Sequence, residues 1–198
     1  MTAAVGMWRT HGRAEMSARQ VSQTASAQAS QINYYYGGLE QLLCSSQGQA
    51  VTAARAWCDA TLADFAGLAM PAGDAETVGR VIAGVIESWC RDRSDLAFAW
   101  TECQMLAPRH ADYADGARQW RSVWRAFWTR MCERLGVGEH ADLTLAFFTG
   151  EAFLHRIVWR APFDRACLVE TCVSWARLLM HGDCGPAPLR DFAREETR

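Results

Sequence analysis

The sequence predicts an all-helical protein, and three observations support this prediction. Apolar residues recur at helical spacing almost from end to end of the 198 residues. Alternating patterns bounded by turn residues, which are typical of strands, are hard to find. Proline and glycine interrupt the periodicity where helices are expected to stop, at Pro71, Pro108, Gly136, Pro162 and within 182–188. A chain of this length suits one domain, or a small module joined to a larger one.

The first 43 residues contain short segments that are too small to form a core of their own. Ser17 and Gln20 fit a capping box, in which the two side chains satisfy backbone amides at a helix start. We therefore expect a helix over Ala18–Ala25, a turn at Ser26 and Ala27, and a second short helix over Gln28–Tyr35. Two short helices joined by a tight turn are typical of a helix-turn-helix.

Six longer helical segments follow, each with apolar residues on one face. They are Leu39–Phe65, Val78–Trp89, Leu96–Leu106, Ala117–Leu135, Leu143–Trp159 and Phe163–Met180. Because only residues 160–162 separate the last two, we expect these two to pack as an antiparallel pair.

Composition and motifs exclude several classes of protein. The formal net charge of −2 means that any nucleic-acid contact must be local. No apolar run approaches the roughly 18 residues of a membrane span, and no secretory signal is recognisable, so we expect a cytoplasmic protein. No GxSxG, HExxH, GxGxxG or P-loop pattern occurs. Neither an enzyme nor a cofactor-binding protein is therefore expected.

The potential metal ligands are too sparse for a metal site. The eight cysteines form no CxxC pair, which argues against a zinc ribbon or a disulfide framework and favours reduced thiols in the core. Glu151 and His155 stand four residues apart on a predicted helix. Two ligands do not complete a site, so we expect no metal there.

An ungapped pattern of small, apolar and aromatic residues runs from Ala3 to Leu43. It consists of Ala3-Ala4-Val5, Met7-Trp8 and Gly12, then Ser17, Arg19, Val21 and Ala25, then Ile32 and Tyr34-Tyr35-Tyr36-Gly37, and finally Glu40, Leu42 and Leu43. In this register the residues resemble the N-terminal head of the TetR family of one-component transcriptional regulators.

The resemblance implies a two-part chain. A helix-turn-helix DNA-binding head covers residues 1–46, and a helical effector-binding and dimerisation body covers 47–198. The implied function is transcriptional regulation, as a repressor that a small effector releases from operator DNA. The resemblance also implies a homodimer through the last two long helices, here Glu139–Trp159 and Pro162–His181, paired as a four-helix bundle.

Departures from the family pattern support a second interpretation. Ser26 replaces the glycine expected at the turn, where a positive φ costs a residue with a side chain about 1 kcal/mol. Leu39 replaces a lysine that in the family approaches a phosphate, and the first helix is shorter than the family's. Three arginines against two glutamates leave the head only weakly basic. The alternative is a helical ligand-binding or interaction protein whose degenerate head does not bind DNA.

Polar side chains of the head are the candidates for DNA contact. Hydroxyl and amide groups can bond phosphates, and Asn and Gln can read adenine. The tyrosines can instead pack the head against the long helix that follows. The predicted DNA-binding residues are Ser17, Arg19, Gln28, Ser30, Gln31, Asn33, Tyr34 and Tyr35.

Aromatic residues gather in the larger part, which holds most of the nine tryptophans. Trp120, Trp124 and Trp128 form one helical stripe, which is either core or the wall of a cavity for an apolar or aromatic effector. Glu102 and Gln104 lie in an apolar stretch, so each either faces solvent or orients a ligand. The predicted ligand-binding residues are Trp57, Trp89, Trp100, Glu102, Cys103, Trp120, Trp124 and Phe127.

Overall fold

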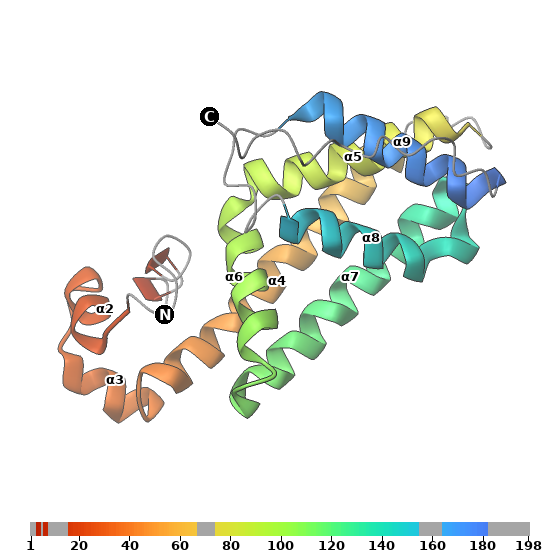
Figure 1. Ribbon diagram of the computed structural model, residues 1–198. Helices are drawn as coiled ribbons and strands as arrows, with labels where there is room; N and C mark the ends of the chain where they lie inside the picture. Colours follow the sequence, from red (N-terminus) through yellow and green to blue (C-terminus); the bar gives the residue numbers. More distant parts are fainter. Residues whose placement is uncertain (1–2, 5, 8–15, 67–73, 155–163, 182–198) are drawn as a thin grey trace, which may run out of the picture.

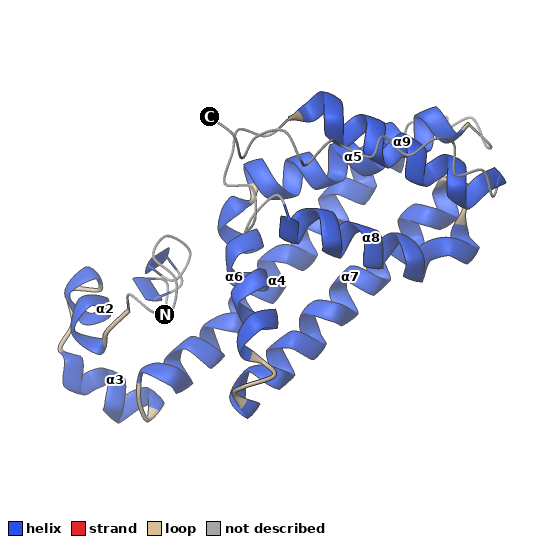
Figure 2. Cartoon of the chain, in the orientation of Figure 1, coloured by secondary structure: helices blue, strands red, loops and turns tan. Residues whose placement is uncertain are grey.

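The computed structural model describes residues 3–4, 6–7, 16–66, 74–154 and 164–181. Every regular element in these ranges is a helix, which confirms the predicted all-α class (Figures 1 and 2). None of the described helices combines the length and the apolar character needed to cross a membrane.

The head contains the predicted helix-turn-helix, formed by α2 (Ala18–Thr24) and α3 (Ala29–Tyr36). The predicted capping box is present: the Ser17 hydroxyl accepts the Gln20 backbone N–H at 3.3 Å, and the Gln20 side-chain oxygen accepts the Ser17 backbone N–H at 2.9 Å. Ser26 has a φ of 51°, in the left-handed region expected for this turn. The hydroxyl-bearing residue therefore occupies a conformation that glycine adopts at lower cost.

One helix belongs to both parts of the chain. α4 (Leu39–Ala66) has 28 residues, a length of about 42 Å at the usual rise per residue. Its first turns pack against α3, and its later turns pack against α6 and α7. Figure 1 shows this orange helix leaving the head and running into the middle of the body. The expected boundary at residues 46 and 47 lies inside α4, so a rigid element joins the head to the body.

The body is a bundle of α4 and five further described helices. The expected segments Val78–Trp89 and Ala117–Leu135 each fall almost wholly within one observed helix. The helices are α5 (Ala75–Asp92), α6 (Ser94–Leu106), α7 (Ala114–Arg134), α8 (Ala141–Phe153) and α9 (Arg165–His181), with short 3₁₀ turns at Ala111–Tyr113 and Gly138–His140.

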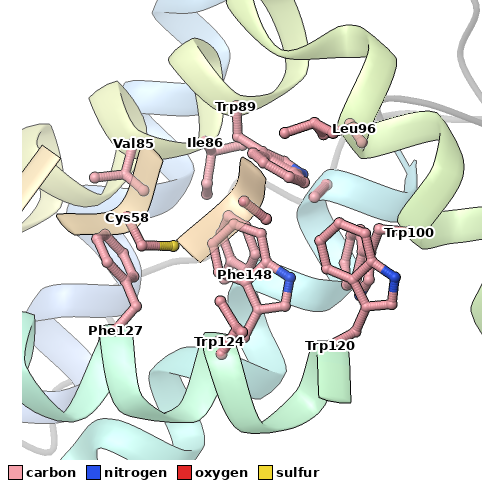
Figure 3. Close-up of a cluster of buried hydrophobic side chains, with 14 of the residues drawn as sticks. Cys58, Val85, Ile86, Trp89, Leu96, Trp100, Trp120, Trp124, Phe127 and Phe148 are labelled. Carbon is pink, nitrogen blue, oxygen red and sulfur yellow. The ribbon is translucent and has the colours of Figure 1, made fainter. Parts of the chain in front are cut away.

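The tryptophan stripe of α7 is part of the core. Trp120, Trp124 and Trp128 have at most 1% of their surface exposed, which favours the core interpretation of the stripe. Figure 3 shows Trp124 and Trp120 on α7 facing Trp89 of α5. The rings of Trp89 and Trp124 meet edge to face with centroids 4.6 Å apart, a favoured aromatic geometry.

The last described helix packs differently from the prediction. α9 packs most extensively against α5, so the described parts of the last two helices do not form the expected antiparallel pair. The physical reason lies at Gly79, where an added Cβ would stand only 2.4 Å from the Cα of Val173; the missing side chain lets α5 and α9 approach closely. The helices α8 and α9 still touch where Phe147 and Trp175 stack with centroids 4.9 Å apart. The predicted helix ends within 155–163 lie outside the described residues.

Candidate functional site

The predicted DNA-binding residues all lie on the surface of the head. Each of the eight is exposed, and Tyr34 and Tyr35 expose 82% and 70% of their surface. Ile32 is buried, and the half-buried Tyr36 packs against the core, so one tyrosine does pack as expected. The helix α3 thus buries one face and presents a polar and aromatic face.

Some of these polar side chains form hydrogen bonds within the head. Ser17 caps α2, and the Gln31 side-chain oxygen accepts the Gln28 backbone N–H at 3.1 Å at the start of α3. The side chains of the others make no hydrogen bond with the described residues; these are Arg19, Ser30, Asn33, Tyr34 and Tyr35. This second group is available to an external partner.

Several hydrogen bonds tie α4 to the body, and two of them involve the first three turns of α4. The Tyr113 hydroxyl donates to a Glu40 carboxylate oxygen at 3.0 Å, and the Trp120 indole N–H donates to the Gln47 side-chain oxygen at 2.9 Å. The second bond is buried on both sides. Because buried polar groups are costly to leave unpaired, this bond fixes the register of α4 against α7.

A half-enclosed pocket of about 520 Å³ lies between α6, α7 and α8. Its volume falls in the ordinary range for small-molecule sites. Tryptophans form part of its wall, and charged side chains of α7 and α8 stand among its lining residues. The lining residues are Trp100, Gln104, Arg121, Trp124, Arg125, Asp142, Leu145, Ala146 and Thr149.

The charges of the pocket are only partly balanced. Arg125 donates to a carboxylate oxygen of Asp142 at 3.0 Å. Arg121, one helical turn earlier, makes no ion pair or hydrogen bond with the described residues. The Thr149 hydroxyl donates to the Leu145 carbonyl oxygen at 2.8 Å. The net charge of the lining side chains is positive.

The structure brings only part of the predicted ligand-binding set to this pocket. Trp100 and Trp124 line it, and so does Gln104, for which a ligand contact was one of the two expected roles. Glu102 is half-buried and does not line it. The remaining predicted residues are packed in or against the core: Trp57, Trp89, Cys103, Trp120 and Phe127.

Sequence reasoning missed the polar lining residues on α7 and α8. Arg121 and Arg125 stand three residues before and one residue after Trp124, so helical spacing could have linked Arg121 to the tryptophan stripe. No such signal exists for Asp142 or Thr149, because their side chains reach the pocket only through the packing of α8 on α7.

The possible metal ligands are dispersed over the described part of the chain. Within the described residues no three His, Cys, Asp or Glu side chains gather in a way that could hold a metal ion. Glu151 lies half-buried on α8, whereas His155 is outside the described residues. Burial raises the pKa of the Cys58 and Cys103 thiols to about 12, so neither is a ready thiolate ligand at neutral pH.

No family model matches the chain, and no curated protein matches it. Solved structures do share its fold. A transcriptional regulator from Streptomyces coelicolor A3(2) matches with a TM-score of 0.63 and 22% identity, over 91% of this chain and 95% of that one. The multidrug binding protein EbrR complexed with ethidium matches with a TM-score of 0.63 and 19% identity, over 86% and 92%. A TetR transcription regulator from Haloarcula marismortui matches with a TM-score of 0.62 and 16% identity, over 91% and 94%.

Proposed function

We propose that this chain, which has the fold of TetR-family transcriptional regulators, is itself a transcriptional regulator that binds operator DNA and responds to a small effector. One observation supports this most directly. A helix with an exposed polar face, α3, is joined through the single helix α4 to a body that contains a ligand-sized pocket. Such a protein acts on DNA in the cytoplasm, and this role requires no catalytic step.

The exposed face of α3 suits the major groove of DNA. A recognition helix contacts base edges while flanking groups bond the backbone. Asn33 can read an adenine, and the hydroxyls of Tyr34 and Tyr35 can donate to phosphate oxygens. Arg19 on α2 supplies a positive charge without an ion-pair partner among the described residues. These groups support the DNA-binding interpretation over the degenerate-head alternative.

The two last described helices support the proposed homodimer. Leu143 on α8 exposes 54% of its surface, although it is a large apolar residue. Phe147 on α8 and Trp175, Leu178 and Leu179 on α9 are each only half-buried. A second copy that covers these residues would remove apolar surface from water. The two-fold axis would place the two heads for half-sites roughly 34–36 Å apart.

Effector control would act through α4. The pocket wall includes Trp124 of α7, and Trp120 on the preceding turn of α7 holds Gln47 of α4. An effector that fits one position of α7 better than another biases α4 and therefore the spacing of the two heads. The size of the response is limited by the difference in effector affinity between the two positions.

The first test is a fluorescence-anisotropy titration of the protein with its own upstream intergenic DNA. It is run at two salt concentrations with unrelated DNA as competitor. Specific, salt-sensitive binding is expected, because phosphate contacts release counterions. Equal affinity for unrelated DNA would instead favour the degenerate-head protein.

Three variants test whether the head binds the operator and the body binds the effector. Arg19→Ala and Tyr34→Phe are expected to weaken operator binding, whereas Arg55→Ala, an equally exposed and unpaired arginine in the middle of α4, is the matched control. Trp124→Phe, which keeps an aromatic ring in the core, is expected to weaken the effector response and to leave operator binding intact. Loss of DNA binding by Trp124→Phe with the dimer preserved would contradict this division.

A further inference from the structure

The pocket between α6, α7 and α8 contains two kinds of surface that one ligand must satisfy together. Leu145 and Ala146 of α8 contribute the accessible apolar surface, and the buried Trp100 and Trp124 reach the pocket only by their edges. Arg121 and Gln104 contribute hydrogen-bond donors that make no hydrogen bond with the described residues. A ligand with an acceptor group can bond these donors in place of water, which a purely apolar ligand cannot do.

The sign of the charge follows from the pairing of the three charged lining residues. Asp142 neutralises Arg125 across a 3.0 Å contact. Arg121 has no such partner in the described part of the chain. Among the pocket-lining residues, the Arg121 guanidinium is therefore the one positive charge that no described carboxylate balances. A guanidinium can bind a carboxylate through two parallel hydrogen bonds. A cationic ligand would meet repulsion from Arg121, with Asp142 already engaged.

We propose that the effector is a small molecule with one anionic group, held by Arg121 while its apolar part lies against Leu145 and Ala146. This inference rests on the proposed function, since it names the class of molecule that the effector site takes. The pocket volume of about 520 Å³ accommodates a molecule of two or three fused rings with a carboxylate. Gln104 supplies a further amide donor or acceptor for the ligand's polar end.

The test compares three naphthalene probes of equal shape and different charge. The probes are 2-naphthoate, neutral 2-naphthamide and the cation 2-naphthylmethylammonium, each titrated by isothermal calorimetry into the full-length protein. We expect 2-naphthoate to bind about tenfold more tightly than the cation, with the amide between them. The preference should shrink as salt is raised, because the rim charges are partly solvated.

Arg121→Gln is the decisive variant, and Arg118→Gln is its matched control. Both arginines lie on the exposed surface of α7, but Arg118 is paired with Asp115 and does not line the pocket. Arg121→Gln should lose the preference for 2-naphthoate and keep its affinity for 2-naphthamide, whereas Arg118→Gln should behave like the parent protein. Because both side chains are exposed, the melting temperature should stay unchanged and serves as the folding check.

The outcomes separate this inference from the proposed function. Equal binding of all three probes, tighter binding of the cation, or an unchanged preference in Arg121→Gln would overturn the anionic class while leaving an effector pocket. Failure of every probe to bind would overturn the inference as well as the effector site. Operator binding, measured by anisotropy on the same variants, reports independently on the DNA-binding half of the proposal.

Discussion

Replacing Gly79 by alanine would force apart two helices that now touch through their backbones. The new Cβ on α5 would stand 2.4 Å from the Cα and 2.6 Å from the backbone nitrogen of Val173, where ordinary contact begins at 3.4 Å. Because the obstacle is backbone, a rotamer change cannot relieve it, and α9 must move by about 1 Å. Overpacking of this kind costs about 1–3 kcal/mol. We expect a net loss of about 2 kcal/mol in the free energy of unfolding.

Gly84 provides the matched control on the same helix. It is exposed, and a Cβ there would meet nothing within 4 Å. Gly84→Ala should therefore show only the gain in helix propensity, about 1 kcal/mol of added stability. The two alanine variants should thus differ by about 3 kcal/mol, although the chemical change is the same.

Urea denaturation at a fixed protein concentration measures the difference, with tryptophan fluorescence as the signal. Since α9 belongs to the proposed dimer surface, size-exclusion chromatography should also show a weaker dimer for Gly79→Ala and an unchanged one for Gly84→Ala. Equal unfolding free energies for the two variants would refute the close packing of α5 on α9.

Further predictions address the link to α4, the thiols and a helix cap. Tyr113→Phe removes the hydroxyl that bonds Glu40, so the free energy of unfolding should fall by about 1 kcal/mol in thermal denaturation. Because this bond joins α4 to the body, the effector-induced release of DNA should also change, as measured by anisotropy. Burial holds the pKa of Cys58 and Cys103 at about 12, so mass spectrometry after brief alkylation at pH 8 should find both unmodified until the protein is denatured. The Thr77 hydroxyl and backbone amides lower the pKa of Asp74 below 3.8. The ionised carboxylate therefore stabilises the fold above that pH, and this stability is lost as the pH falls through the lower folded pKa. In a pH series of melting temperatures, Asp74→Asn should reduce the fall in melting temperature at acid pH.

The head could be predicted from the sequence because its signals are local. Ser17 and Gln20 stand three residues apart and satisfy each other's backbone amides whatever the rest of the chain does. Ser26 and Gly37 occupy left-handed positions, and both lie at a predicted helix end or turn. The inward face of α3 follows from helical periodicity, because the buried Ile32 and the half-buried Tyr36 stand four residues apart.

The candidate pocket could be predicted only in part. Periodicity grouped Trp120, Trp124 and Trp128 on one side of α7, yet only Trp124 of the three lines the pocket. Which tryptophan faces a cavity and which faces the core depends on the helices that cover them. Arg121 was missed for the same reason. An exposed arginine on a helix is ordinarily a solvent-facing residue, and only the packing of α8 beside Trp124 makes Arg121 part of a pocket.

By itself, the sequence determined the all-helical class, the helix-turn-helix and most helix positions, since these depend on contacts within a few residues. The tertiary structure alone decided which faces meet. The bond between Gln47 and Trp120 joins residues 73 positions apart, and α9 packs on α5 because one glycine admits the backbone of Val173. Contacts of this kind arise from the shapes of surfaces that are adjacent only after folding, so residue spacing along the chain carries no record of them.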